Sequence, residues 1–417
     1  MKIFWTLAPR VRRSLVVLLI SGFCFWASLG SQLPTLPLYI GDLGATEQQL
    51  GVVMGAFALG LLGSRAWLGR MADQRSRKVV LQIGLMVAAI APLLYLGVKT
   101  LPILFAVRAF HGVSLAAFTT AYTALVVDLS PREQRGELIG YMSLINPIGV
   151  MLGPTVGGLL QAWAGYLPLF LLASGLAIFG LLAASTIDEG LAQGESKPQV
   201  SKKQKFWGLL QAPRLKIPAT VMLLIGLTFG TLSTFVPLLI RETAVDLNAG
   251  LFYSVAAIAS FVIRVLTGKA SDRLGRGRFI SMSLGCYGLA MILLWLAHTE
   301  LTFLLAGIFQ GCGSGTLIPM IAALMADRSE PHERARVLSL CISGFDVGIA
   351  LAGPCLGTVA TLVGIRPMFG LACGFAGVAL LLFATSNSKD FSHSIAFALG
   401  NGRDIYALDS VAPNVAQ

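Results

Sequence analysis

The sequence predicts an all-α membrane protein whose twelve transmembrane helices form two pseudo-symmetric halves of six. Three observations support this fold class: the composition, the spacing of apolar segments and an internal repeat. The 417-residue chain is 55% hydrophobic and only 12% charged, whereas globular domains carry about 25% charged residues. A soluble fold of this length has too little interior for so many apolar side chains, so the surplus must face lipid.

Twelve apolar segments are long enough to cross a bilayer. A helical span needs about 20 apolar residues, because each residue adds about 1.5 Å towards roughly 30 Å of hydrocarbon. Short polar runs separate the segments. The predicted spans are 14–40, 49–70, 79–98, 101–128, 137–162, 166–186, 217–240, 248–271, 279–298, 301–326, 337–364 and 367–386.

The placement of the basic residues predicts how these spans are oriented. Most of the 31 Lys and Arg residues lie in the N-terminal stretch, the even-numbered connections and the C-terminal tail, whereas the odd-numbered connections hold only Lys99, Arg241 and Arg366. Cytoplasmic connections carry an excess of basic residues, so both termini are expected on the cytoplasmic side. The expected membrane is a bacterial-type inner (plasma) membrane. The net charge of +11 therefore sets orientation, and no nucleic acid partner is expected.

The sequence offers no pattern for a metal site, a cofactor or catalysis. The six cysteines are scattered singly without a Cys-x-x-Cys pair, and the four histidines lie in different segments. Neither a disulfide framework nor a metal site is therefore expected. A Walker A lysine loop is also missing from the sequence, so ATP is not the expected energy source. We expect no enzyme activity and no cofactor.

An internal repeat relates the two halves, as in transporters built from repeated six-helix units. Gly69–Arg77 recurs as Gly268–Arg276, with an offset of 268 − 69 = 199, and 128–135 recurs as 327–334 at the same offset. The weak periodicity of the tail predicts a loosely ordered segment. The resulting organisation is a cytoplasmic N-terminus 1–13, a six-helix half 14–188, a cytoplasmic linker 189–215, a second half 216–386 and a cytoplasmic tail 387–417.

The repeated segment Gly69–Lys78 resembles the cytoplasmic signature of the major facilitator superfamily, Gly-x-Leu-Ala-Asp-Arg-x-Gly-Arg-Lys. It departs from this signature at Met71, Gln74 and Ser76. The resemblance implies the twelve-helix fold of that superfamily, with gating latches that close when the substrate cavity faces outward. A run of charges that only orients the protein is the alternative. The latch residues are Gly69, Asp73, Arg77, Lys78, Asp128, Gly268, Asp272, Arg276 and Asp327.

Acidic side chains end predicted helices on the cytoplasmic side, where the helix dipole is negative and a lone carboxylate is unfavourable. Asp73 therefore needs a cation or the start of another helix, which we expect to be the start of span eleven. Gly69 should let that helix approach closely. By the same reasoning Asp128 should pair with Arg75 or Arg77, and the second copy should form the equivalent contacts.

Span four contains a basic residue inside the membrane. Arg108-Ala-Phe-His111-Gly112 resembles a second superfamily signature, Arg-x-x-Gln-Gly, with His111 in place of glutamine. Arg108 lies about 10 Å deep at helical rise, which is costly unless it faces a wet cavity or a partner. The alternative is that its side chain extends outward to the interface. His111 could titrate near neutral pH or could be a packed core residue.

Span five carries a glycine motif. It matches, without departure, the signature Gly-x8-Gly-x3-Gly-Pro-x2-Gly-Gly of the drug/proton antiporter group of that superfamily, and this resemblance implies an exporter. Gly149, Gly153 and Gly157 share one helix face, so they predict backbone-close helix packing. Gly153→Leu should separate the packed helices, whereas Gly153→Ala should be mild. The motif residues are Gly140, Gly149, Gly153, Pro154, Gly157 and Gly158.

Asp346 is the main candidate for carrying the coupling proton. It lies 346 − 336 = 10 residues after Arg336, about 15 Å into the membrane at helical rise, and an acid at such a depth indicates function. A fixed ion pair with Arg108 or Arg264 is the structural alternative. Arg108 and His111 are the further candidates for proton coupling. The substrate cavity is expected to include Gln32, Asn146, Phe235 and Gln310.

These observations predict a secondary active transporter that exports small amphipathic organic compounds by proton antiport. Its expected partners are a small-molecule substrate, the proton and the lipid bilayer, and a monomer is expected. A sugar or metabolite exporter of the same fold and a transporter-like sensor that moves nothing are the alternatives. Because both copies of the cytoplasmic signature are retained, transport is favoured over sensing.

Overall fold

The computed structural model of the chain describes residues 7–131, 134–188, 212–330, 333–388, 390–402 and 404–408. Every regular element in these residues is a helix, and twelve helical segments are long and apolar enough to cross a membrane. The twelve predicted spans are therefore confirmed. Of the predicted linker 189–215, residues 189–211 lie outside the described part. For a few helical residues only the backbone is described: Gly136, Gly268, Lys269, Asp272, Arg273, Ala335 and Arg336.

Contacts divide the chain into two compact units. The first unit comprises the described part of 1–199 together with Ser233–Ala257, and the second comprises the described part of 200–232 together with Ile258–Gln417. The units follow the predicted halves except that the end of span seven and the start of span eight pack with the first unit.

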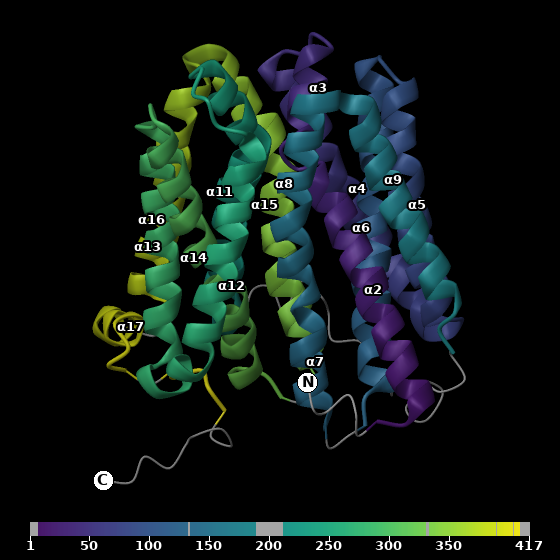
Figure 1. Cartoon of the computed structure of the whole chain (residues 1–417). Coiled ribbons are helices and arrows are strands. Elements are labelled where there is room, and N and C mark those ends of the chain that lie inside the picture. The colour runs from purple at the N-terminus through teal and green to yellow at the C-terminus, as the bar shows by residue number, and fades with distance from the viewer. Residues whose placement is uncertain are drawn as a thin grey trace. The chain divides into compact units, whose positions relative to one another are not determined.

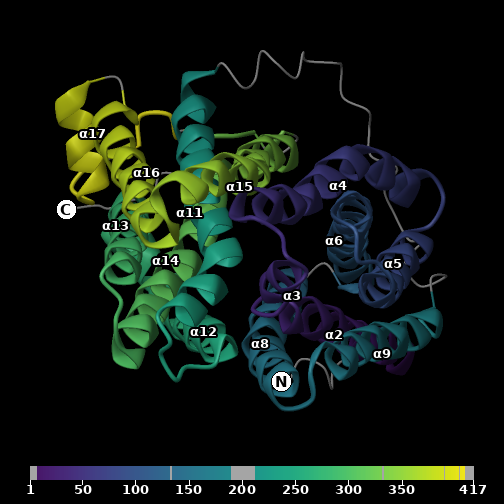
Figure 2. The same ribbon diagram turned by 90° about the horizontal axis from the view of Figure 1, so that it is seen from above.

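In the first unit, one helix is central to each of two groups. Helix α2 runs between α8 and α9, and α6 packs against both α4 and α5 (Figures 1 and 2). The helices are α2 (Pro9–Ser31), α3 (Leu36–Asp42), α4 (Glu47–Gln74), α5 (Arg77–Gly97), α6 (Leu101–Leu129), α7 (Arg135–Ser143), α8 (Ile145–Ala164) and α9 (Tyr166–Ser185).

The second unit is built around α13, which packs against α14, α16 and the short α17 (Figure 1). Helix α11 begins at Pro213, so the linker ends earlier than predicted. The helices are α11 (Pro213–Glu242), α12 (Ala249–Leu274), α13 (Arg276–Trp295), α14 (Glu300–Asp327), α15 (Arg334–Val363), α16 (Ile365–Ser386) and α17 (Phe391–Ala398). The ends of α11 and α12 nearest their connection belong to the first unit.

Span one consists of two helices, α2 and α3, which the sequence pattern does not reveal. Pro34 lies between them and has no N–H, so one helical hydrogen bond cannot form. The chain continues in the same direction, because the N–H of Leu36 donates to the carbonyl of Gln32 at 3.0 Å. The break places Gln32 in the interior, where its side chain is 2% exposed.

The two copies of the cytoplasmic signature turn in different ways. In the first copy Ser76 has an extended backbone and its hydroxyl accepts a hydrogen bond from the Val79 N–H at 3.0 Å, which caps α5. In the second copy Gly275 precedes α13 with φ 83°, a conformation that favours glycine. The departure at Ser76 therefore replaces a glycine turn with a side-chain cap.

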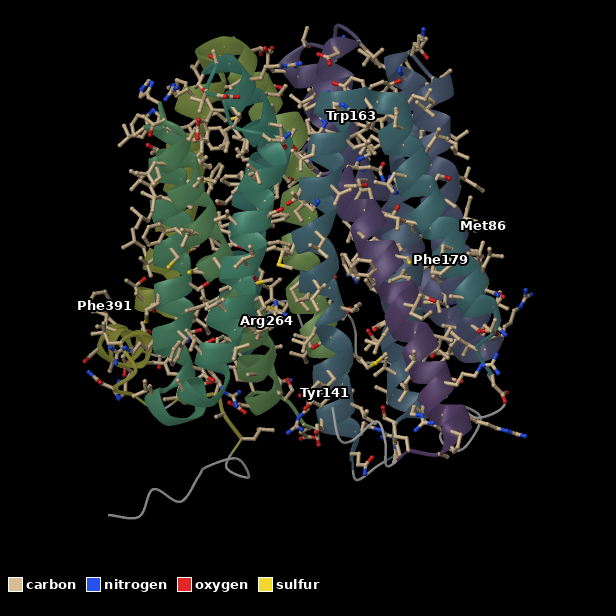
Figure 3. The ribbon with its side chains drawn as sticks, in the orientation of Figure 1. Met86, Tyr141, Trp163, Phe179, Arg264 and Phe391 are labelled. Carbon is tan, nitrogen blue, oxygen red and sulfur yellow. The ribbon has the colours of Figure 1, made fainter. Side chains whose placement is uncertain are left out.

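Large apolar side chains on the outer surface fit a lipid environment. Met86 and Phe179 are 45% and 59% exposed, and Figure 3 shows both pointing away from the helices of the first unit. Trp163, near the end of α8, is 88% exposed, as expected of an aromatic residue at a membrane–water interface. The buried core lies between the helices and includes Phe118 in the first unit and Tyr287 in the second.

The expectation of a loosely ordered tail is wrong for residues 390–402 and 404–408. Helix α17 packs against α13 and α16, and Figure 3 shows Phe391 at its start, pointing outward. The hydroxyl of Ser281 donates to the Ala398 carbonyl at 2.9 Å. Tertiary contacts, which leave no periodic sequence signal, therefore order this segment.

Candidate functional site

The predicted glycine stripe of α8 packs directly on the backbone of α2. A Cβ atom added at Gly153 would lie 2.7 Å from the carbonyl oxygen of Ala27 and 2.9 Å from the amide nitrogen of Ser31. Gly149 and Gly157, which lie one helical turn before and one turn after Gly153 on α8, also pack on the backbone of α2. The prediction of a backbone-close interface is confirmed, and it needs glycine because any side chain would separate the helices.

The opposite side of the motif contacts the segment 248–257 of the first unit. A Cβ atom at Gly158 would collide with the side-chain oxygen of Asn248. The hydroxyl of Ser254 donates to the Met151 carbonyl at 2.7 Å and also contacts the Thr155 hydroxyl. Helix α8 is thus held between α2 and the start of α12. The roles of Asn248 and Ser254 have no sequence motif, and sequence reasoning missed them.

The remaining motif residues differ in their surroundings. Pro154 lies inside α8, and its carbonyl oxygen is in close contact with Gly250. Gly140 lies in α7 rather than α8, and a Cβ atom added there would meet no atom within 4 Å. Five of the six motif residues therefore lie at a packed interface, and the sixth, Gly140, lies in open surroundings.

Arg108 and His111 lie together in a buried polar group of the first unit. His111 is fully buried, and its Nδ1 atom lies 3.2 Å from the hydroxyl of Tyr95 on α5. The guanidinium of Arg108 is 4.4 Å from the ring centre of Phe57 on α4, a cation–π contact. Arg108 is only 8% exposed, so its side chain does not extend outward to the interface.

Two buried nitrogen atoms in this group have no hydrogen-bond partner among the described residues: Nε of Arg108 and Nε2 of His111. Buried polar atoms are normally satisfied by protein or water. The glycine of this signature also has a structural reason, since Gly112 packs against the Phe57 carbonyl of α4. The group therefore combines tight packing with unused donor or acceptor capacity.

The predicted ion pairs of the two signature copies are confirmed. Arg77 at the start of α5 pairs with Asp128 at the end of α6, and Arg276 at the start of α13 pairs with Asp327 at the end of α14. All four side chains are only partly exposed. In addition, Lys78 donates to the Ile187 carbonyl at 2.7 Å. Each pair places a cation beside a negative helix end, as the dipole argument requires.

The contacts expected of Asp73 and Gly69 stay predictions. Asp73 is exposed at the end of α4 and forms no hydrogen bond or ion pair within the described part of its unit. Gly69 likewise has no atom of its unit close enough to require glycine. The side chain of Asp272 and the surroundings of Gly268 lie outside the described residues.

Asp346 lies in the middle of α15 and is 7% exposed. Gly344 and Gly348, two residues before and after it, pack on the backbone of α11. Because two residues are about 200° around a helix, the Asp346 side chain leaves α15 on the side turned away from α11. In Arg264, which Figure 3 labels on α12, the buried Nε atom has no hydrogen-bond partner among the described residues.

The four residues expected at the substrate cavity are mostly interior. Gln32, Phe235 and Gln310 are buried and Asn146 is partly exposed. The Gln32 amide nitrogen donates to the Ser28 carbonyl at 3.1 Å, and its Oε1 atom has no partner among the described residues. Whether these residues line one cavity stays a prediction.

Comparison with known proteins agrees with these features. The protein-family model described as Major Facilitator Superfamily matches residues 18–299 and 221–396. The Staphylopine export protein of Staphylococcus aureus is 27% identical over 363 residues, covering 84% of this chain and 89% of the relative. Multidrug resistance protein MdtG of Salmonella typhimurium is 29% identical over 383 residues, covering 88% of this chain and 93% of the relative.

Solved transporter structures share the fold. The nucleoside transporter NupG superimposes with a TM-score of 0.73 at 18% identity, covering 93% of this chain and 98% of that chain. A POT family transporter in complex with 5-aminolevulinic acid gives a TM-score of 0.75 at 15% identity, covering 89% and 95%. At such identities the resemblance concerns the fold alone.

Proposed function

This chain belongs to the Major Facilitator Superfamily, and we propose that it exports small amphipathic organic compounds in exchange for protons. The chain is a multi-pass membrane protein and a transporter of that family. The direction of transport, the coupling ion and the substrate class are the proposal. We further propose that the protein lies in the inner membrane with both termini on the cytoplasmic side, and that it works as a monomer.

The observation that carries the proposal is that the α8 part of the glycine motif lies in a packed interface. Gly149, Gly153 and Gly157 meet α2 at backbone distance, so the motif is built into the structure and is more than a chance match. In the family the pattern accompanies exporters. Such an interface lets two helices shift along each other without separating, which suits a helix that must move during alternating access.

The names of the relatives support export. One relative is called an export protein and the other a multidrug resistance protein, and each aligns with more than 80% of this chain. Because the alignments cover most of both chains, a related activity is the simplest expectation. A few side chains in the cavity decide which substrate is bound. Sequence identities of 27% and 29% therefore support a shared activity and not a shared substrate.

For the proton we propose Asp346 as the carrier, assisted by Arg108 and His111. Asp346 is a buried acid in the middle of a transmembrane helix, the position in which a carboxyl group most readily alternates between charged and neutral forms. Arg108 and His111 are buried with unused nitrogen atoms, which can bind a substrate group or water.

The proposed latch role of Asp73 gives a direct prediction. Asp73→Asn should lower transport at least roughly tenfold, the scale of a coupling worth about 1.4 kcal/mol between gate and cavity, while the protein stays inserted and folded. Because Asp73 is exposed and forms no hydrogen bond or ion pair within the described part of its unit, the loss would report gating and not folding. Substrate flux per inserted protein is the measurement.

The matched control is Glu137→Gln, which removes another exposed carboxylate at the start of α7 and should leave the flux unchanged. If Asp73→Asn combined with Asp272→Asn transports at the wild-type rate, the two acids serve orientation only and the latch proposal fails.

The export proposal itself is tested by growth across a panel of toxic organic compounds. A strain that overproduces the protein should tolerate some amphipathic compounds better than a strain with the inactive Gly153→Leu variant, and cells loaded with such a compound should lose it faster. Faster uptake in place of faster loss would contradict export. Movement of sugars alone, or of nothing, would favour the metabolite exporter or the sensor.

A further inference from the structure

The most deeply buried charged side chain of the described residues lies beside the second signature pair. Arg328, directly after Asp327, is 1% exposed. Its partner is Asp404 of the tail: Nε donates to Oδ2 at 2.6 Å and Nη2 donates to Oδ1 at 2.9 Å. Two parallel hydrogen bonds between opposite charges fix both distance and orientation.

The same guanidinium joins several chain segments. Nη1 of Arg328 donates to the Arg214 carbonyl at the start of α11 at 3.0 Å, and Nη2 lies 3.5 Å from the Asn387 carbonyl after α16. The ring of Tyr406 lies 5.1 Å from the guanidinium carbon. Arg328 thus ties the end of α14 to α11, to the end of α16 and to the tail.

The tail also reaches both partners of the signature pair. The N–H of Leu408 donates to the backbone carbonyl of Asp327 at 3.0 Å. On the other side, Gly277, next to Arg276, packs closely on the backbone of Phe397 in α17. The tail therefore holds the end of α14 and the start of α13, which are the two elements that bring Asp327 and Arg276 together.

Among the described residues of the first unit, no buried charge occupies the equivalent position. With the repeat offset of 328 − 129 = 199, the counterpart of Arg328 is Leu129, which is 3% exposed. An apolar residue serves there for packing next to the Arg77–Asp128 pair. The buried charge in the second unit is therefore no requirement of the repeated fold, and it needs a reason of its own.

We propose that Asp404 and Arg328 are positioning residues for the second gating pair, with the segment 404–408 as a clamp that holds Asp327 opposite Arg276. This inference rests on the proposed gating role of the signature pairs. A buried ion pair that loses one partner leaves a charge without compensation. The tail would then leave its site, and the end of α14 would no longer be held at Arg276.

The test is Asp404→Asn in the full-length protein. The maximal rate for whichever substrate the wild type moves should fall roughly fivefold or more, because an uncompensated buried arginine displaces the tail. The substrate KM should stay within about a factor of two, since only a step after binding is affected. Asp390→Asn is the control, because Asp390 is 70% exposed and its carboxylate pairs with the exposed His393 at 3.3 Å; it should behave as wild type.

A second comparison separates positioning from general stabilisation. In an Asp327→Asn background the gating pair is already lost, so Asp404→Asn should cause no further loss of rate. Additive losses would show that Asp404 acts elsewhere and would overturn the proposal, as would a wild-type rate in Asp404→Asn alone. If Asp404→Asn does not fold, the double variant Arg328→Leu/Asp404→Leu replaces it, because this variant leaves no buried lone charge. The double variant should fold and still transport slowly. Transport at the wild-type rate by the double variant would contradict the proposal.

One readout needs no transport. Lys389 and Arg403 are trypsin sites of the tail, and limited proteolysis of the membrane-inserted protein should cut the tail of Asp404→Asn several-fold faster than that of the wild type or Asp390→Asn. Equal cutting rates would refute the clamp. This result is independent of whether the protein exports compounds or couples to protons, so the failure of one proposal is distinguishable from the failure of the other.

Discussion

Gly153→Leu should abolish transport, and Gly153→Ala should already impair it. The Cβ atom of alanine would lie 2.7 Å from the Ala27 carbonyl oxygen and 2.9 Å from the Ser31 nitrogen, both far below contact distance. These are backbone atoms of α2 and cannot move aside as a flexible side chain can. Overpacking by one methyl group typically costs about 1–3 kcal/mol, and leucine adds a larger side chain to the same contact. The expectation from sequence that alanine is mild is therefore revised.

The control lies in the same motif. Gly140→Ala should be neutral, because an added Cβ atom at Gly140 meets nothing within 4 Å. Substrate efflux and the thermal stability of the purified protein should be measured for all three variants at matched expression. If Gly153→Leu transports as well as Gly140→Ala, the tight α2–α8 interface is not needed during the transport cycle.

Asp346→Asn should abolish proton-driven transport while sparing exchange. Asparagine keeps nearly the shape of aspartate but cannot take up and release a proton. Substrate should therefore still equilibrate down its own gradient, whereas accumulation driven by a pH gradient should fall to background. Asp346→Glu should retain part of the coupling, because a titratable carboxyl group remains. Both quantities can be measured in proteoliposomes with and without an imposed pH gradient.

Asp246→Asn is the control for this experiment. Asp246 is an exposed acid between α11 and α12, so its loss should change neither exchange nor coupling. An Asp346→Asn protein that concentrates substrate as the wild type does would show that Asp346 is structural. His111 would then be the next candidate for the proton.

The fold and the signature ion pairs could be predicted because both follow from local rules. Spans are long apolar segments, and the repeat offset carries each motif from one half to the other. Asp128 and Asp327 end helices whose dipole disfavours a lone carboxylate, so basic partners at the start of the next helix could be inferred. The glycine stripe of α8 was likewise visible as a spacing of four residues, which fixes one helix face.

The features that sequence missed depend on tertiary contacts between distant residues. The tail segment up to Leu408 lacks periodicity, and it is held by tertiary contacts, among them the hydrogen bonds of Asp404 with the buried Arg328. The contacts of Ser254 and Asn248 with α8 join residues about a hundred positions apart. The glycines at 344 and 348, which repeat in α15 the packing role of the α8 stripe, were hidden because the second half lacks the full motif.

The most direct test of proton-coupled export uses the wild-type protein in proteoliposomes loaded with a compound identified in the growth assay. The orientation of the protein in the liposome is determined from the side on which added trypsin cuts the tail. An imposed pH gradient that drives protons in the direction opposite to the compound should move the compound against its own concentration gradient. Dissipating the pH gradient should abolish this uphill movement. Uphill movement that persists without a pH gradient, or equilibration alone with the gradient in place, would contradict proton antiport.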